Sequence, residues 1–121
     1  MWRKAGARVI MVTAETHDRI ASSVSQLPHL LAAELMNSVP APLLPFAGSG
    51  LRDTTRIAQG DPGLWTDIVG TNRTHLVSDL KRYIARLQKL ISDLVHKQDA
   101  RIMSRLLQAR RARRRLNHFK K

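Results

Sequence analysis

Residues 46–65, FAGSGLRDTTRIAQGDPGLW, place two turns and two helix starts within a short stretch. The first turn is a run of small residues, Gly48, Ser49 and Gly50. Without bulky side chains, the backbone there can turn tightly or let a ligand approach closely. The second turn contains Gly60, which readily ends a helix, followed by the pair Asp61 and Pro62, which suit the cap and first position of the next helix. A corner between two helices is therefore predicted.

Between these turns a short helix is expected over residues 51–59, opened by Asp53, whose carboxylate suits the positive end of the helix dipole. Arg56 follows three residues later and projects from the same helical face. The two side chains can form a surface ion pair, or they can share an anionic ligand. The residues alone leave both interpretations open.

The composition indicates one soluble domain. A chain of 121 residues with 43% hydrophobic residues is long enough for a modest core. It has no cysteine, which excludes disulfides and thiolate metal sites. No signal peptide fits the first residues, and the longest uncharged run, residues 35–51, contains three prolines, which argues against a membrane helix. We expect a soluble cytoplasmic protein.

The formal net charge of +12 is concentrated at the C-terminus. Residues 97–121 carry ten of the 21 Lys and Arg residues and a single acid, Asp99. A basic run of this kind is usually solvated, although it can also bind a polyanion. Phe119 is its one aromatic residue, and base-reading motifs are absent. The rest of the chain has an ordinary charge balance.

The N-terminal segment, residues 1–12, suggests the end of a helix, a stop at Gly6, and a strand over residues 8–12 that is rich in β-branched residues. A lone strand is not stable in water. We therefore expect this segment to be the last piece of an upstream α/β domain. The alternatives are that it folds onto the chain's own helices or pairs with a second copy.

A helix is expected from Glu15 to about Val39, with Thr13 as its N-cap. Its apolar residues recur at spacings of three and four, the pattern of one buried stripe, at Ile20, Val24, Leu27, Leu31 and Leu35. Pro28 lies in the middle and predicts a kink near Ser25. No carboxylate stands at metal-ligand spacing beside His29. On the residues alone, His29 is either a hydrogen-bonded core histidine or a ligand-facing one.

Two more helices are predicted further along. A short one over residues 62–70 carries Trp65, a core anchor on the residues alone. A long one begins near Asn72 and shows heptad a and d spacing at Leu76, Leu80, Tyr83, Leu87, Leu90 and Leu94. Three further residues widen this stripe at intervals of seven, namely Val77, Ile84 and Ile91. Since the chain has only one other long helix, a second copy is the expected partner, giving a homodimer.

Two strings together resemble the C-terminal helical domain of prephenate dehydrogenases. They are HDRIASSVSQLPHLLAAELMNSV, residues 17–39, and GSGLRDTTRIAQGDPGLWTDI, residues 48–68. The resemblance runs over roughly residues 2–94. It implies an all-α dimerisation domain over residues 13–108, with a kinked first helix and a long heptad-patterned helix. A remnant of an upstream Rossmann domain would precede it at residues 1–12, and a basic tail would follow at residues 109–121.

The resemblance also implies a substrate-binding role for several residues. Arg56 matches the arginine expected to pair with a prephenate carboxylate, and His29 would donate to the substrate. Asp53 would position an arginine or its own loop, and Trp65 would border the site. The backbone of Gly48, Ser49 and Gly50 would approach the ligand. This sequence departs from the family at Gln26, where histidine is more usual, and at Ser49, where a third glycine is common.

By resemblance, the whole enzyme converts prephenate to 4-hydroxyphenylpyruvate with loss of carbon dioxide, on the way to tyrosine. NAD or NADP would bind to an upstream domain that also carries the catalytic histidine. We therefore expect no catalytic, cofactor-binding or metal residue in this chain, and no activity from it alone. The alternatives are a non-catalytic helical dimer that binds nucleic acid or another polyanion through the basic tail, and a dimer module that binds tyrosine.

Overall fold

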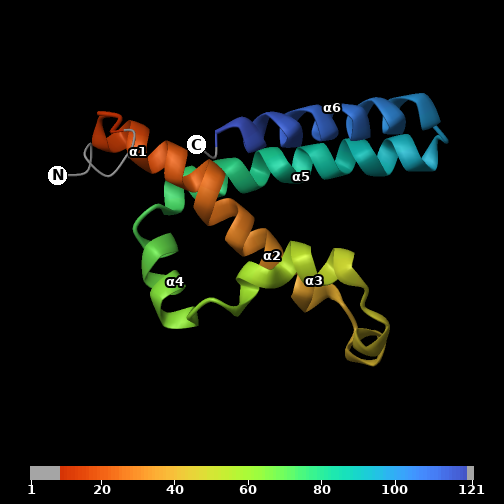
Figure 1. Cartoon of the computed structure of the whole chain (residues 1–121), viewed down its shortest axis with the longest axis horizontal. Coiled ribbons are helices and arrows are strands. Elements are labelled where there is room, and N and C mark those ends of the chain that lie inside the picture. The colour runs from red at the N-terminus through yellow and green to blue at the C-terminus, as the bar shows by residue number, and fades with distance from the viewer. Residues whose placement is uncertain (1–8, 120–121) are drawn as a thin grey trace. The chain divides into compact units, whose positions relative to one another are not determined.

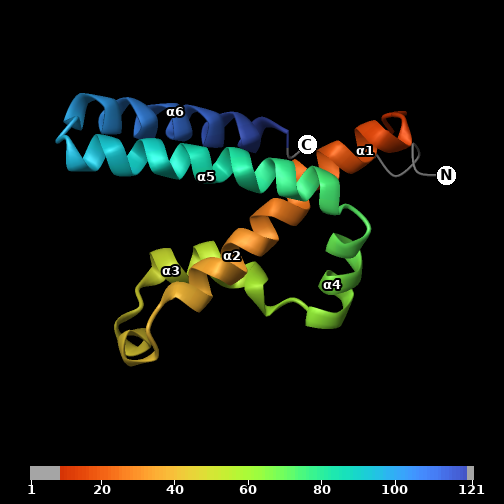
Figure 2. The same ribbon diagram turned by 180° about the vertical axis from the view of Figure 1, so that it is seen from behind.

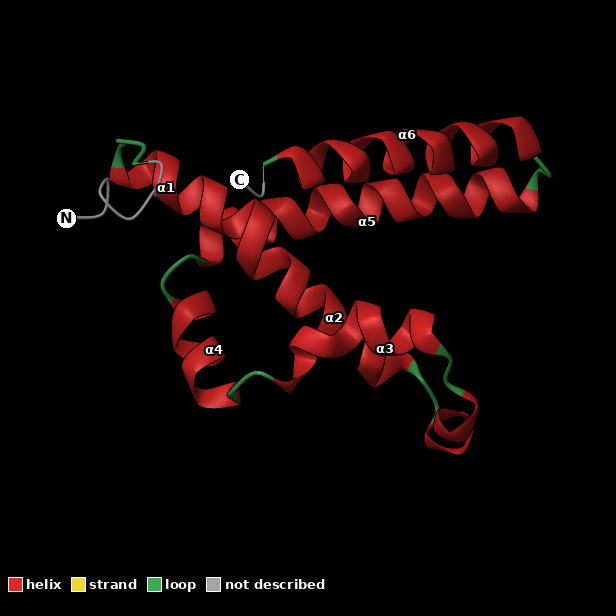
Figure 3. Ribbon diagram, viewed as in Figure 1, coloured by secondary structure: helices red, strands yellow, loops and turns green. Residues whose placement is uncertain are grey.

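The computed structural model describes residues 9–119. Every regular element in this part is a helix, and short turns join the helices (Figures 1 and 3). The predicted all-α class is therefore confirmed. The chain divides into two compact units, Met1–Leu80 and Lys81–Lys121. Helix α5, Arg73–Val95, begins in the first unit and ends in the second.

Residues 9–12 are the last four residues of the predicted strand. They are exposed and have no regular secondary structure. A strand needs a neighbour to pair its backbone groups, and the described residues supply none. The strand prediction is therefore wrong for these four positions. Gly6 and Arg8 lie outside the described residues, and a domain boundary near residue 12 stays a prediction.

The first predicted helix forms as three consecutive elements. Helix α1, Ala14–Ala21, begins at Thr13, whose Oγ1 accepts a hydrogen bond from the backbone N–H of Thr16 at 3.2 Å. A π-helical turn, η2, follows over Ser22–Gln26, and α2 continues over Leu27–Ser38. The predicted cap at Thr13 is confirmed.

The π-helical turn is the interruption that Pro28 predicted near Ser25. A proline inside a regular α-helix lacks an N–H, and its ring clashes with the carbonyl four residues earlier. Here Leu27 donates its N–H to the carbonyl of Ser22, five residues back, so the turn is wider than an α-helical one. The wider turn is the local adjustment of the helix to Pro28.

The buried face of this helix differs from the predicted stripe. Its buried residues are Ser22, Gln26, His29 and Ala32. The predicted apolar residues Ile20, Val24 and Leu35 are exposed instead. Most of the buried face is therefore polar, whereas the apolar stripe is exposed at three of its five positions and half-buried at Leu27 and Leu31.

Hydrogen bonds to Asp79 of α5 and to Asn72, just before α5, explain why polar residues of the first helix are buried. The hydroxyls of Ser22 and Ser23 both donate to Oδ2 of Asp79, at 2.6 and 2.9 Å. The side-chain amide of Asn72 donates to Oε1 of Gln26 at 2.8 Å and to the carbonyl of Asp18 at 2.7 Å. Buried polar groups are stable when paired in this way.

The corner between helices lies within the same unit. A 3-10 helix, η3, spans Ala41–Phe46, followed by α3 over Ser49–Thr55 and a second 3-10 turn, η4, over Arg56–Gln59. Helix α2 packs against α3 and η4. Helix α3 starts at Ser49 with Gly48 as its N-cap, so the prediction that Asp53 opens the helix is wrong.

The next helix, α4, spans Pro62–Gly70, as predicted. Asp61 caps it, with Oδ1 accepting from the N–H of Leu64 at 2.7 Å. In the second unit, residues 81–95 of α5 and α6, Asp99–His118, form an antiparallel hairpin (Figures 1 and 2). The predicted basic tail is therefore helical as far as His118.

Candidate functional site

One groove of the first unit brings together three of the predicted site residues. It has a volume of about 480 Å³ and is lined by Val24, Ser25, Pro28, His29, Arg56, Ile57, Gly60 and Trp65. His29 comes from α2, Arg56 from the start of η4, and Trp65 from α4. These residues are far apart in the sequence, and the corner between α3 and α4 brings them to one place.

The imidazole of His29 and the indole of Trp65 form the wall of this groove. Their ring centroids are 3.5 Å apart, and their planes differ by 14°. Only 7% of His29 is exposed, and Trp65 is half-buried. Gly60 packs directly against the pair, because a Cβ there would lie 2.7 Å from Nε1 of Trp65 and 2.8 Å from Cε1 of His29. A side chain at position 60 would therefore displace the stacked rings.

Arg56 is an exposed residue of the groove lining. Within residues 9–119 its guanidinium makes no ion pair or hydrogen bond, and Asp53 makes none either. Of the two interpretations left open for this pair of residues, the ion pair is therefore not formed. Asp53 lies in the middle of α3 and does not line the groove. The unpaired guanidinium is available to bind a carboxylate.

The small-residue run lies outside the groove lining. Gly48 has an ordinary extended backbone, with φ −85° and ψ −176°, and Ser49 and Gly50 are the first residues of α3. Of the two alternatives given for this run, the tight turn is therefore not formed, and the close approach of a ligand stays a prediction. A Cβ at Gly48 or Gly50 would meet nothing within 4 Å, so the surface of this run is open.

Five lining residues were not predicted to belong to the site, namely Val24, Ser25, Pro28, Ile57 and Gly60. Gly60 was assigned only to ending a helix, whereas the structure adds its contact with the two rings. Gln26, one position after Ser25, points instead to Asn72 and is buried. The amide of Gln26, where the family more usually has histidine, is therefore held by a hydrogen bond from Asn72. No local signal singles out Gln26, because Ser22, Ser23 and Ser25 make this stretch of the helix polar on several sides.

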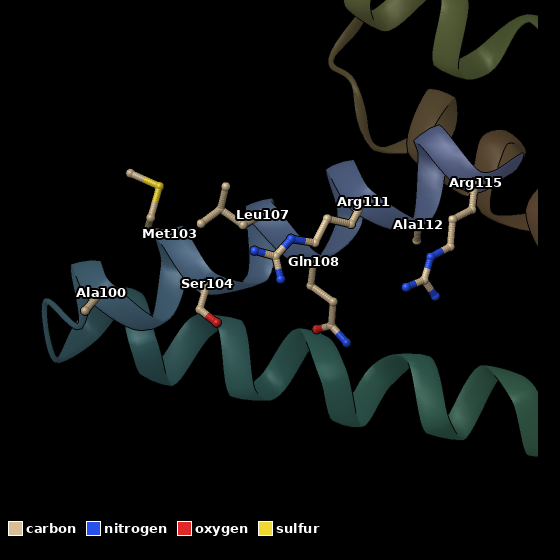
Figure 4. Close-up of a pocket in the computed structure, with 8 residues that line it drawn as sticks. All are labelled: Ala100, Met103, Ser104, Leu107, Gln108, Arg111, Ala112 and Arg115. Atoms are coloured by element: carbon tan, nitrogen blue, oxygen red, sulfur yellow. The ribbon is translucent and has the colours of Figure 1, made fainter. Parts of the chain in front are cut away.

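Three further cavities among the described residues contain none of the predicted site residues. One of them, of about 630 Å³, follows one face of α6 (Figure 4). Among the residues that the structure describes, no group of three His, Asp or Glu side chains could hold a metal ion. In that same part of the chain, no helix is long and apolar enough to cross a membrane.

The groove combines three chemical capacities. The guanidinium of Arg56 can bind a carboxylate through two parallel hydrogen bonds. The stacked imidazole and indole offer an aromatic surface, against which a planar ring packs favourably. The ring nitrogens of His29 can hydrogen-bond a polar substituent. A small molecule with an aromatic or unsaturated ring and a carboxylate would match all three.

Comparisons with known proteins agree on one family. The model of the prephenate dehydrogenase dimerization domain matches residues 13–109. A cyclohexadienyl dehydrogenase from Zymomonas mobilis is 30% identical over 119 residues, covering 93% of this chain and 41% of the relative. The prephenate dehydrogenase of Bacillus subtilis is 33% identical over 100 residues, covering 78% of this chain and 27% of the relative.

Solved structures of similar proteins have the same fold. The arogenate dehydrogenase of Synechocystis superposes with a TM-score of 0.85 at 25% identity, covering 94% of this chain and 44% of that one. The prephenate dehydrogenase of A. aeolicus, in complex with hydroxyphenyl propionate and NAD+, has a TM-score of 0.83 at 26% identity, covering 95% and 42%. The chain thus spans less than half the length of these relatives. This chain belongs to the prephenate dehydrogenase family, and residues 13–109 form its dimerization domain.

Proposed function

We propose that this chain supplies the substrate-binding and dimerisation part of a dehydrogenase that acts on prephenate. In that reaction the ring of prephenate gives a hydride to the nicotinamide of NAD or NADP and loses carbon dioxide, which leaves 4-hydroxyphenylpyruvate. The role of this chain is to bind and orient the substrate. The sequence has no Gly-x-Gly-x-x-Gly motif, so we assign the cofactor to another part of the enzyme.

The observation that carries this proposal is the shared groove of Arg56, His29 and Trp65. An unpaired guanidinium beside an aromatic wall is complementary to a ring that bears a carboxylate. The A. aeolicus relative is described in complex with hydroxyphenyl propionate, a molecule of this type. We assign carboxylate binding to Arg56, ring contact to Trp65 and hydrogen bonding to His29. The assignments to Asp53, Gly48, Ser49 and Gly50 remain predictions.

The test is a titration of the chain with hydroxyphenyl propionate, followed by the NMR signals of the His29 ring. The wild-type chain should show saturable shifts. Arg56→Ala should weaken binding by about 2–4 kcal/mol, on the order of 30- to 1000-fold. Arg52→Ala is the matched control, because Arg52 is an exposed arginine of α3 outside this groove. Unchanged His29 signals in the folded wild-type chain, or equal losses in both variants, would contradict the assignment.

In a complete enzyme that contains this chain, the same substitution has a kinetic consequence. Arg56→Ala should raise the KM for prephenate far more than the KM for the nicotinamide cofactor. An unchanged KM for prephenate would contradict the assignment of carboxylate binding to Arg56.

The homodimer is a second part of the proposal. Val77, Ile84 and Ile91 stand seven residues apart on one side of α5 and are 49%, 51% and 59% exposed. Leu87 and Leu94 extend this apolar stripe and are also exposed. A stripe of this length on one helix indicates a protein contact. The matched heptad spacing suits the same helix of a second copy.

Sedimentation equilibrium tests the homodimer. Ile84→Lys should convert a dimer to a monomer, because it places a charge inside the apolar contact. Ala85→Lys adds the same charge about 100° around the helix and should leave the dimer intact. A monomeric wild-type chain, or dissociation by both variants, would contradict the assigned surface.

The comparisons give no support to the nucleic-acid alternative. Binding of tyrosine would use the same groove, because tyrosine also has a ring and a carboxylate, and competition with hydroxyphenyl propionate would detect it. The expected cytoplasmic location stays a prediction.

A further inference from the structure

A second groove lies within the unit Lys81–Lys121, between α5 and α6, and has a volume of about 530 Å³. Its lining residues are Arg86, Lys89, Ser92, Asp93, Arg101, Ser104, Arg105 and Gln108. Four of them are cationic and one is anionic, so positive charge prevails. We propose that this groove binds a small multivalent anion of the oligophosphate class.

A buried carboxylate holds two of the four cations in place. Asp93 is 4% exposed, and its Oδ2 accepts from Nε of Arg105 at 2.8 Å. Nη1 of Arg101 lies 3.7 Å from Oδ1 of the same carboxylate. The bond at Nε uses one of the five N–H groups of the Arg105 guanidinium, and its terminal groups remain for a ligand. Asp93 therefore orients Arg105 within the groove.

The other two cations, Arg86 and Lys89, have no ion pair or hydrogen bond among residues 9–119. They stand three residues apart on α5, so they share a face and repel each other. An anion between them would remove this repulsion. The arginine forks match phosphate oxygens in two parallel bonds, and lysine binds phosphate as a point charge.

On α5, the cationic groove and the apolar stripe face opposite ways. Residues two apart in an α-helix point about 200° apart. Arg86 stands two residues after Ile84, and Lys89 stands two residues from both Leu87 and Ile91. A dimer formed through the apolar stripe would therefore leave this side of α5 open.

The same arrangement holds on α6. Arg105 stands two residues from both Met103 and Leu107, which are exposed. Figure 4 shows Met103 and Leu107 pointing away from α5, whereas Ser104 and Gln108 point toward it. The hairpin thus has an apolar side and a cationic, hydrogen-bonding side. This groove lies before the arginine run at residues 110–115 and does not depend on it.

The size and charge of the groove favour a phosphate chain over a single carboxylate. A volume of about 530 Å³ is in the range of small-molecule sites and exceeds the needs of one carboxylate. Several cations around one cavity suit a ligand that carries several negative charges along a short chain. Such a chain can be free or can be part of a nucleotide.

The test is isothermal titration of the full chain with tripolyphosphate at 150 mM salt. We expect saturable binding at one site per chain. The double variant Arg86→Gln/Lys89→Gln should weaken it at least 10-fold. The matched control is Arg110→Gln/Arg114→Gln, which removes the same charge from exposed arginines of α6 outside the groove and should change the affinity by less than 2-fold. Circular dichroism confirms that both variants are folded.

ATP as a second ligand distinguishes the two sources of the phosphate chain. Affinity equal to that of tripolyphosphate would support a site for the chain alone, and tighter binding would support a nucleotide site. Equal losses in the groove variant and the control variant would overturn the proposal, because diffuse attraction to a basic surface would then explain binding. No saturable binding of either ligand would also overturn it.

Discussion

Replacing Gly60 with alanine should destabilise the protein through a steric contact alone. The backbone of Gly60 has φ −59° and ψ 155°, which alanine adopts without strain. Its Cβ would lie 2.7 and 2.9 Å from Nε1 and Cδ1 of Trp65 and 2.8 Å from Cε1 of His29. Carbon atoms pack best at about 3.5–4.0 Å, so the rings would have to move by about 1 Å. Both rings are stiff and already stacked, so the displacement costs packing energy.

The magnitude follows from two opposing effects. Overpacking of this kind costs about 1–3 kcal/mol, part of which is the lost ring stacking. Alanine also restricts the unfolded chain, which stabilises the folded state by about 0.4–1 kcal/mol. The steric cost is larger, so we expect a net loss of about 1–2 kcal/mol. Gly50→Ala should have the opposite sign, because a Cβ there meets nothing within 4 Å and the residue lies in α3.

Urea unfolding followed by far-UV circular dichroism measures both effects at one fixed protein concentration, since association shifts apparent stability. Near-UV circular dichroism, in a Trp2→Phe background, reports the packing of Trp65. Gly60→Ala should lower the midpoint and reduce the Trp65 signal, whereas Gly50→Ala should raise the midpoint and preserve the signal. Equal stability of the two variants would refute the claim that Gly60 is constrained by the rings.

Three further predictions concern the first helix and its contacts with α5. Asp79→Ala should cost about 2–4 kcal/mol in urea unfolding, because two serine hydroxyls lose their acceptor, whereas the exposed Asp67→Ala should stay within about 0.5 kcal/mol of wild type. Gln26→Leu and Asn72→Leu should each destabilise the protein by about 1–3 kcal/mol, because each leaves a buried amide without its partner. A double-mutant cycle should give a coupling energy of at least about 0.5 kcal/mol, and additive losses would argue against their hydrogen bond. Deletion of Val24 removes one residue from the π-helical turn and should lower the free energy of unfolding by about 2–4 kcal/mol, with a loss of Trp65 packing in near-UV circular dichroism. Val24→Ala keeps the length of the turn and should change the stability little, because Val24 is 71% exposed.

Local signals in the sequence predicted much of the fold. Thr13 and Asp61 cap helices where expected, because a cap depends on a few adjacent residues. Pro28 marks the interruption of the first helix, because its effect is also local. The groove residues His29, Arg56 and Trp65 came from the family resemblance, since spacing alone left each of them with an ordinary structural role.

Contacts between segments far apart in the chain could not be predicted from the sequence. The helical period predicted an apolar buried stripe through Ile20 and Val24, yet the face buried in this chain contains Ser22 and Gln26. Their partners, Asp79 of α5 and Asn72 just before it, lie about fifty residues away, and no local pattern identifies them. Asp53 was assigned as a helix start because its charge suits one, but α3 begins at Ser49, so propensity gave the wrong boundary.

The π-helical turn connects these findings, because it lets two sets of contacts form at once. Within the turn, Ser22 and Ser23 donate hydrogen bonds to Asp79; after it, His29 stacks on Trp65. Each residue in an α-helix rotates the chain by about 100°, so an extra residue in one turn changes the face that follows. With one residue fewer, a helix anchored at Asp79 would turn His29 away from the indole. The geometry of the groove therefore depends on Pro28 and on polar contacts outside the groove, as well as on the residues that line it.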